Sequence, residues 1–367
     1  MFSPKINCFW GKNGVGKTNL LDTIYYLSFC KSHLNAIDNQ LINHNADFFM
    51  IQGEYDLDGT AEVVSCAVKQ RRKKQFMYNK KEYERLADHI GKFPLVLVSP
   101  SDLSLIAEGS DERRRFMDMI ISQYDRQYLD NLMTYNSALQ SRNALLKHPE
   151  TLDYTMLEVL EEKMCSLAEP IFLSRTNFIE QFIPVFKEFY RKIANNAVAL
   201  SDGEKSTEQK QISSFSQNDE IVDLLYISHL QQISLKEKFL LSREKDKILG
   251  FTTAGIHKDD LEMTLNGFPL KRTGSQGQNK SYLVAMKLAQ FKFLKNISGK
   301  TPILLLDDLF DKLDTERVKQ IITEISSDEF GQIFITDTNS EHLNELIADA
   351  NSDYSLFNII NGEVSKK

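Results

Sequence analysis

The sequence is poor in the features that mark secreted, zinc-stapled or membrane-spanning proteins. Its four cysteines lie far apart and form no C-x-x-C pair, which argues against structural zinc and favours a reducing, cytoplasmic setting. No apolar run approaches the roughly 20 residues that a membrane span needs, and the N-terminus lacks the pattern of a secretion signal. We therefore expect a cytoplasmic protein without a membrane partner.

The chain also lacks an excess of positive charge. Its 44 lysines and arginines are outnumbered by 51 acidic residues, for a net charge of −7. Any affinity for nucleic acid must therefore arise from a local basic patch. The 42% hydrophobic and 26% charged residues are ordinary for a globular protein, and 367 residues suffice for two domains or for one domain with a large insertion.

A glycine-rich stretch near the N-terminus carries the clearest motif. Residues 11–18 read G-K-N-G-V-G-K-T and fit G-x-x-x-x-G-K-[ST] at every fixed position. A strand-like run at 6–10 leads in and a helical pattern at about 18–29 leads out, which is the context of a nucleotide phosphate loop and disfavours a chance glycine-rich turn. The predicted ATP-binding residues are Gly11, Lys12, Asn13, Gly14, Val15, Gly16, Lys17, Thr18 and Asn19. Lys17 is predicted to reach the β and γ oxygens and Thr18 to hold Mg²⁺.

A second stretch near the C-terminus completes this chemistry. The apolar run 302–306 is typical of a parallel-sheet strand and ends in Asp307-Asp308. Ligands of open α/β sheets bind beyond the carboxyl ends of strands, so we expect Asp307 to complete the Mg²⁺ shell and Asp308 to polarise the attacking water. Lys17 and Asp308 are the predicted catalytic residues. The alternative is that the two acids only cap the next helix.

Residues 273–278 predict another anion site. They read T-G-S-Q-G-Q ahead of a helix expected at 279–295, and a serine and a glycine before a helix N-terminus favour anion binding. Because the chain already has a phosphate loop, we infer that Ser275, Gly277 and Gln278 act on the nucleotide of a second copy. The sequence thus predicts that the two anion sites meet across a dimer.

Two basic runs are candidate contacts to a DNA backbone, and each is equally consistent with a solvated surface. The first, at the expected tip of an antiparallel hairpin after strands at 48–53 and 61–69, contains Lys69, Arg71, Arg72, Lys73 and Lys74. The second, Arg113 with Arg114 and Arg115, opens a long helical region expected at 112–242. Strand-like patterns follow at 250–253 and 261–265. For the lone His257 we favour a structural role.

Taken in order, these motifs resemble the RecF family of ABC/SMC-like ATPases. Residues 275–278 resemble the ABC signature, Asp307-Asp308 the Walker B pair and residues 311–314 the D-loop. The phosphate loop and signature are much closer together in transporter ATPases. Their long separation here is that of SMC and RecF heads, although the insertion is too short for an SMC coiled coil. The RecF-like stretches are 14–22, 113–118, 141–147, 255–261, 274–278 and 305–308.

The resemblance implies an α/β fold: an ABC/SMC-like P-loop ATPase head built from both chain ends, with an inserted helical lid. Residues 1–111 and 246–367 would form the head and 112–245 the lid. It further implies an ATP-dependent DNA-binding recombination mediator that dimerises with ATP and binds gapped or single-strand–double-strand junction DNA. Acting with RecR and RecO, it would help RecA to load, and its DNA-dependent ATP hydrolysis would be weak.

The sequence departs from the family pattern in three places. Family members usually carry a further strand ahead of the phosphate loop; we expect a truncated chain or an internal start, which the mass of the native N-terminus would test. Residues 336–338 read T-D-T where ABC proteins have a switch histidine, so the γ-phosphate sensor is unassigned. Asp308 is shorter than the usual glutamate. Two other classes stay open, a small-molecule P-loop kinase and an ABC-like scaffold without DNA contact.

Overall fold

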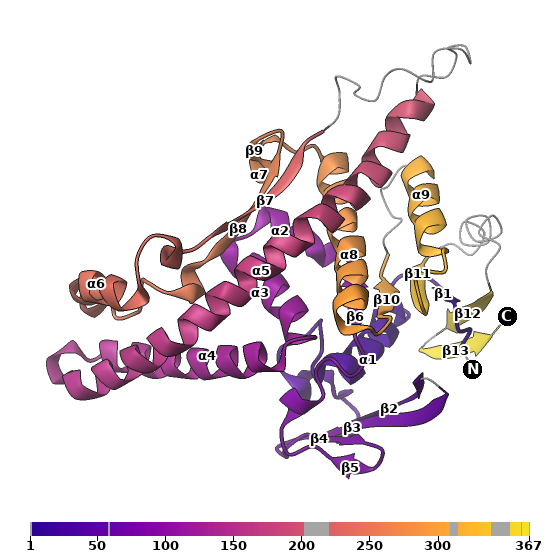
Figure 1. Ribbon diagram of the computed structural model, residues 1–367. Helices are drawn as coiled ribbons and strands as arrows, with labels where there is room; N and C mark the ends of the chain where they lie inside the picture. Colours follow the sequence, from indigo (N-terminus) through magenta and orange to yellow (C-terminus); the bar gives the residue numbers. More distant parts are fainter. Residues whose placement is uncertain are drawn as a thin grey trace. The chain divides into compact units, whose positions relative to one another are not determined.

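The computed structural model describes residues 2–57, 59–201, 220–308, 315–338, 353–360 and 362–366. By its internal contacts the chain divides into two compact units (Figure 1). We call Met1–Pro100 with Leu294–Lys367 the sheet unit, and Ser101–Phe293 the helical unit.

A six-stranded sheet organises the sheet unit, in the order β13-β12-β1-β11-β10-β6. Its strands are β1 (Ile6–Trp10), β6 (Leu95–Val98), β10 (Ile303–Leu306), β11 (Ile333–Asp337), β12 (Tyr354–Ile360) and β13 (Glu363–Lys366). All pairs are parallel except β12 with β13. The N-terminal strand β1 therefore lies between two strands from the other end of the chain, which confirms a head built from both ends. Helices α1 (Lys17–Phe29) and α9 (Thr315–Ile325) belong to the same unit.

An antiparallel lobe packs on α1. Its strands are β2 (Phe48–Leu57), β3 (Thr60–Lys69), β4 (Gln75–Tyr78) and β5 (Lys81–Glu82), accompanied by short 3₁₀ turns at Asp38–Leu41 and Leu86–Asp88. One face of this sheet joins Tyr26 and Leu27 of α1 in a buried cluster that includes Val64 and Phe76. The predicted hairpin is confirmed, because the basic run connects β3 to β4.

The helical unit is dominated by α3 (Ser110–Ser122), α4 (Arg126–Leu146) and α5 (Tyr154–Ser201). Asp125 caps α4 by accepting a hydrogen bond from the Tyr128 N–H at 2.9 Å. The other helices are α2 (Ser104–Ala107), α6 (Leu235–Leu249), α7 (Leu270–Thr273) and α8 (Gln276–Ser298, which runs on into the sheet unit), with 3₁₀ turns at Pro100–Leu103, Pro149–Thr151, His229–Gln231 and Ile256–Lys258.

A small antiparallel sheet in this unit corrects two expectations. It comprises β7 (Val222–Ile227), β8 (Asp260–Leu265) and β9 (Phe268–Pro269). The sequence predicts a helical region from 112 to 242, interrupted only by a polar stretch at 199–218. This prediction is wrong at β7, because the segment gains a full ladder of partners from β8. The strand at 250–253 was also wrong: Gly250 takes φ +70° and ends α6, so the chain turns there. A two-residue turn at Asn266-Gly267 joins β8 to β9, with φ of +53° and +79°.

The pairing of β7 with β8 also explains why residues 246–293 fall in the helical unit. The sequence predicts that these residues belong to the ATPase head. The predicted boundaries between head and lid, at 112 and 245, stay a prediction. The predicted D-loop, residues 311–314, and most of the polar stretch 199–218 lie outside the described residues. Among the described helices, none is long and apolar enough to cross a membrane.

Candidate nucleotide-binding site

The phosphate loop links the end of β1 to the start of α1, as the motif requires. Gly14 and Gly16 take φ of +82° and +104°, values at which any L side chain is strained. At Gly11 a Cβ atom would come within 2.6 Å of the Ile359 carbonyl oxygen on β12. The glycines are therefore required by backbone shape and by close approach, and the loop opens at the N-terminus of α1, where backbone N–H groups favour an anion.

Lys17 is folded over its own loop. Its side chain is buried, and Nζ donates hydrogen bonds to the carbonyl oxygens of Gly11 at 2.8 Å and Lys12 at 3.2 Å. Both partners of the Lys17 ammonium group are backbone carbonyl oxygens, and neither hydrogen bond joins it to a carboxylate. The charge is therefore available to a phosphate that enters the loop.

The carboxylate of Asp307 accepts hydrogen bonds from two hydroxyl groups of the sheet unit, one on α1 and one on β11. Its Oδ1 accepts from the Thr18 hydroxyl at 3.1 Å and from the Thr336 hydroxyl at 2.7 Å. Asp307 follows β10, and its own N–H donates to the Val98 carbonyl oxygen at 2.9 Å. The predicted strand before the acidic pair is confirmed, and Asp307 and Thr18 lie together as the sequence predicted.

Asp308 continues this arrangement with an unusual backbone. Its φ of +46° lies in the left-handed region, which non-glycine residues seldom adopt and which concentrates at functional sites. Its N–H donates to the Thr336 hydroxyl at 3.0 Å. Thr336 thus links both acids. Sequence reasoning left this threonine unassigned. It lies on β11, which pairs directly with β1, the strand that leads into the phosphate loop, and no local sequence pattern indicates that pairing.

The donor set suits a hard cation. A threonine hydroxyl and a carboxylate, each beside a phosphate loop, are the oxygen ligands that Mg²⁺ takes from protein alongside water and substrate phosphates. Thr18 and Asp307 would hold the ion. Within the described residues, no group of three or more His, Cys, Asp or Glu side chains is arranged to hold a metal.

The signature-like residues lie in the helical unit, at the start of α8. The Gln278 N–H donates to the Ser275 hydroxyl at 3.2 Å, and the Ser275 N–H donates to the Gln278 side-chain oxygen at 2.7 Å. This reciprocal cap fixes the helix start and leaves Ser275 exposed. The helix buries one apolar stripe, which comprises Leu283, Met286, Ala289 and Phe293.

In the first basic run, one cation is bound to neighbouring residues of the lobe and the other four are exposed to solvent. The Lys74 ammonium donates to the Cys30 carbonyl oxygen and pairs with Asp38 at 2.8 Å, so it helps to hold the lobe together. The remaining four are exposed and make no side-chain hydrogen bond or ion pair to the described residues; they are Lys69, Arg71, Arg72 and Lys73.

The second basic run is mostly engaged within the helical unit. Arg113 forms a two-pronged ion pair with Asp260, at 2.7 and 3.0 Å, and Arg114 donates to the Asp259 carbonyl oxygen. Their side chains are only 14% and 11% exposed, whereas that of Arg115 is 68% exposed. Of the predicted DNA contacts in this run, Arg115 alone keeps an open surface; the other two hold the 259–260 turn.

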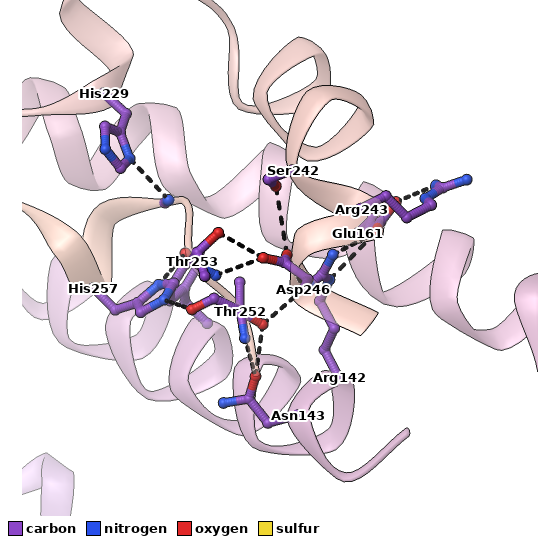
Figure 2. Close-up of polar contacts among 12 residues, drawn as sticks. Arg142, Asn143, Glu161, His229, Ser242, Arg243, Asp246, Thr252, Thr253 and His257 are labelled. Atoms are coloured by element: carbon purple, nitrogen blue, oxygen red, sulfur yellow. Dashed lines mark hydrogen bonds and ion pairs between the residues drawn. The ribbon is translucent and has the colours of Figure 1, made fainter. Parts of the chain in front are cut away.

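Buried arginines of the helical unit are the largest feature that sequence reasoning missed. Figure 2 shows Arg142 of α4 between Asp246 of α6 and Glu161 of α5, at 2.9 and 2.7 Å. Arg175 similarly joins Asp259 and Asp118, at 2.8 and 2.9 Å. Arg142, Asp118 and Asp259 fall in RecF-like stretches, yet their contacts are structural.

His257 belongs to the same buried region. Its Nε2 lies 3.1 Å from the carbonyl oxygen of Thr252, which Figure 2 labels beside it. Its Nδ1 lies 3.2 Å from the Tyr135 hydroxyl. Because a carbonyl only accepts, Nε2 carries the proton and Nδ1 accepts from Tyr135. Burial lowers the pKa of His257 to about 4. These contacts agree with the structural role that we favoured.

Fold and site together define an ABC/SMC-like P-loop ATPase head. A profile of the RecF/RecN/SMC N-terminal domain family matches residues 1–358. The chain is 53% identical over 366 residues to the DNA replication and repair protein RecF of Bacteroides fragilis, covering 100% of this chain and 93% of that protein. It is 47% identical over 365 residues to that of Porphyromonas gingivalis, covering 99% and 94%. The chain belongs to the RecF family.

Solved structures agree. A structure of the recombination mediator protein RecF with ATP, from the RecFOR pathway, matches with a TM-score of 0.84 at 26% identity, covering 100% of this chain and 92% of the other. An Smc head domain from Pyrococcus furiosus matches with a TM-score of 0.54 at 16% identity, covering 100% and 90%. The second likeness concerns the fold alone.

Proposed function

We propose that this chain is an ATP-dependent, DNA-binding mediator of recombinational repair. The observation that carries the proposal is the meeting of the Thr18 hydroxyl with the Asp307 carboxylate beside the phosphate loop. This pairing joins residues 289 positions apart, and its chemistry serves a nucleotide with Mg²⁺. Because the relatives are named DNA replication and repair proteins, we extend the proposal from nucleotide binding to DNA binding.

Each residue of the site has a distinct task in this proposal. The loop N–H groups and Lys17 bind the phosphate chain, and Thr18 and Asp307 hold Mg²⁺, which neutralises charge on the β and γ oxygens. Asp308 orients the attacking water. Since its carboxylate is one methylene shorter than a glutamate, we expect weak hydrolysis that DNA stimulates. Thr336, which bonds both acids, positions them.

ATP then joins two copies of the chain. Ser275 is exposed at the N-terminus of α8, where a helix favours an anion. In the dimer that we propose, Ser275, Gly277 and Gln278 of one subunit bind the γ-phosphate held by the other. Hydrolysis would remove the shared ligand and release the dimer.

The proposed DNA contacts are to the backbone. The exposed cations at the β3–β4 tip, with Arg115 of the helical unit, would hold phosphates without reading sequence. The preferred DNA would be gapped or would contain a single-strand–double-strand junction. The RecF structure with ATP is described as part of the RecFOR pathway, and we accordingly propose that RecR and RecO act with this chain when RecA is loaded.

Analytical ultracentrifugation of the Asp308→Asn variant tests the nucleotide-driven dimer. With ATP and Mg²⁺ the variant should sediment as a dimer, because ATP binds but is hydrolysed slowly; without nucleotide it should be a monomer. Adding Lys17→Ala to the same variant provides the matched control and should abolish the shift. A monomer under all conditions would contradict the shared site, and ADP production by a monomer without DNA would favour a small-molecule kinase.

A further inference from the structure

The outer face of the antiparallel lobe exposes apolar side chains that do not belong to its buried cluster. Phe48, at the start of β2, is 58% exposed, and Met50 on the same face is 56% exposed. The alternate residues Phe49 and Ile51 pack against the buried cluster instead. Phe48 is therefore an exposed ring on a rigid strand, with its neighbours on the strand held in place by the core.

The strand register sets this ring beside the basic tip. Phe48 is paired with Lys69 of β3, and directly opposed residues of an antiparallel pair project from the same face with Cβ atoms about 5 Å apart. The Gln70 N–H also donates to the Asp47 carbonyl oxygen at 3.3 Å, which continues the ladder beyond Phe48. Ring and cation are thus held in register by backbone hydrogen bonds.

The cations at this tip have no partner within the described chain. Lys69 and residues 71–73 are exposed and make no side-chain hydrogen bond or ion pair to the described residues. Arg71 takes φ +61°, so the turn that carries them is tight. An exposed aromatic ring beside unpaired cations is the combination that binds single-stranded nucleic acid, through base stacking and phosphate contacts.

We propose that Phe48 stacks on an unpaired base where a single strand leaves a duplex, while Lys69 and the cations at 71–73 hold the adjacent phosphates. The inference rests on the proposed DNA binding. It adds a residue, Phe48, that would make the chain prefer junction DNA to fully paired duplex. Cations alone bind any DNA backbone. Within a duplex both faces of each base are already stacked, so the ring adds affinity only where a base is unpaired.

The test uses the full chain with ATP, Mg²⁺ and two fluorescent DNAs. One is a gapped duplex with 2-aminopurine at the first unpaired position, and the other is a blunt duplex of the same sequence. Phe48→Leu keeps an apolar side chain of similar bulk but has no ring, and Phe48→Tyr keeps the ring. Phe268→Ala in the helical unit removes another exposed phenylalanine, 62% exposed, and serves as the matched control.

Phe48→Leu should weaken binding of the gapped duplex about tenfold, as expected for the loss of one base–aromatic stack, and should remove the change in 2-aminopurine fluorescence. Its affinity for the blunt duplex should stay within about twofold of the unaltered protein. Phe48→Tyr and Phe268→Ala should behave like the unaltered protein on both DNAs.

The two possible failures are distinguishable. If Phe48→Leu binds both DNAs normally, or weakens both equally, the stacking role of Phe48 is wrong while DNA binding stands. If the unaltered protein binds neither DNA with ATP present, the proposed function fails and the inference falls with it. An equal loss with Phe268→Ala would also overturn the inference, since any exposed ring would then have the same effect.

Discussion

The two units use positive charge in opposite ways. In the helical unit, the guanidinium groups of Arg142 and Arg175 are at most 1% exposed and paired with carboxylates of the same unit. In the sheet unit, Lys17 bonds only loop carbonyls in the contacts described, and the cations at 71–73 face solvent. Internal pairs hold the helical unit in shape without any ligand. Lys17 and the cations at 71–73 make no ion pair with the described residues and would gain one when an anion binds.

The sharpest way to break this comparison is to remove a buried arginine. Arg142→Ala would leave Asp246 and Glu161 buried without their common cation, and losing one partner of a buried pair typically costs about 3–5 kcal/mol of unfolding free energy. Urea unfolding would measure the loss. Arg115→Ala, at an exposed pair with Glu112, should cost less than about 1 kcal/mol. Similar losses for the two variants would contradict the contrast between buried and exposed arginines.

Removal of Lys17 should have the opposite effect: it should lower ATP affinity and leave the unfolding free energy almost unchanged. Hydrogen bonds to charged groups contribute about 1.5–3 kcal/mol, so Lys17→Ala should weaken ATP binding roughly tenfold to hundredfold while the unfolding free energy without ATP changes little. Isothermal titration calorimetry and urea unfolding supply the two readings. A large loss of stability with unchanged ATP affinity would place Lys17 among the structural cations.

Acid should weaken both units through one buried histidine in each. Burial lowers the pKa of His89 and of His257 to about 4, against about 6.5 in the unfolded chain. Between these values the unfolded chain binds more protons, so the stabilisation is fully present above pH 6.5 and is lost as pH falls towards 4. From pH 7 to pH 5 each histidine should cost about 2 kcal/mol. Unfolding curves of His89→Gln and His257→Gln should each show a shallower pH dependence; an unchanged slope in both would refute the prediction.

The smallest effect concerns the exposed tip. Arg71→Ala should weaken DNA binding modestly and reduce the slope of log affinity against log salt by about 1, as for one lost phosphate contact. Arg113→Ala should leave that slope unchanged and lower stability instead, because its partner is Asp260. Fluorescence anisotropy over a range of salt concentrations would compare them. Equal slopes for the unaltered protein and Arg71→Ala would exclude Arg71 from the DNA surface.

Much of the nucleotide site could be predicted because its residues lie in short contiguous motifs. The phosphate loop, the strand before Asp307 and the helix after Ser275 can each be recognised from the residue types of one short segment, without knowledge of the tertiary contacts. Thr336 was missed because its role depends on the order of strands in the sheet. The arginine runs show the same limit, since their composition is alike and only the tertiary partners separate Arg113 from Arg71. Likewise β7 gains its ladder from β8, which begins more than 30 residues later.

The position of β1 between β11 and β12 has a consequence for synthesis on the ribosome. The phosphate loop is synthesised before Asp307 and Thr336, whose carboxylate and hydroxyl bond to one another and, through Asp307, to Thr18. Domains generally fold as units while the chain grows at about 5–20 residues per second, so the helical unit can assemble while β1 still waits for its neighbours. A chain that ends between Thr18 and Asp307 carries the Walker A motif but lacks the carboxylate that accepts a hydrogen bond from Thr18. This pair is therefore complete only when translation has reached the far side of the sheet.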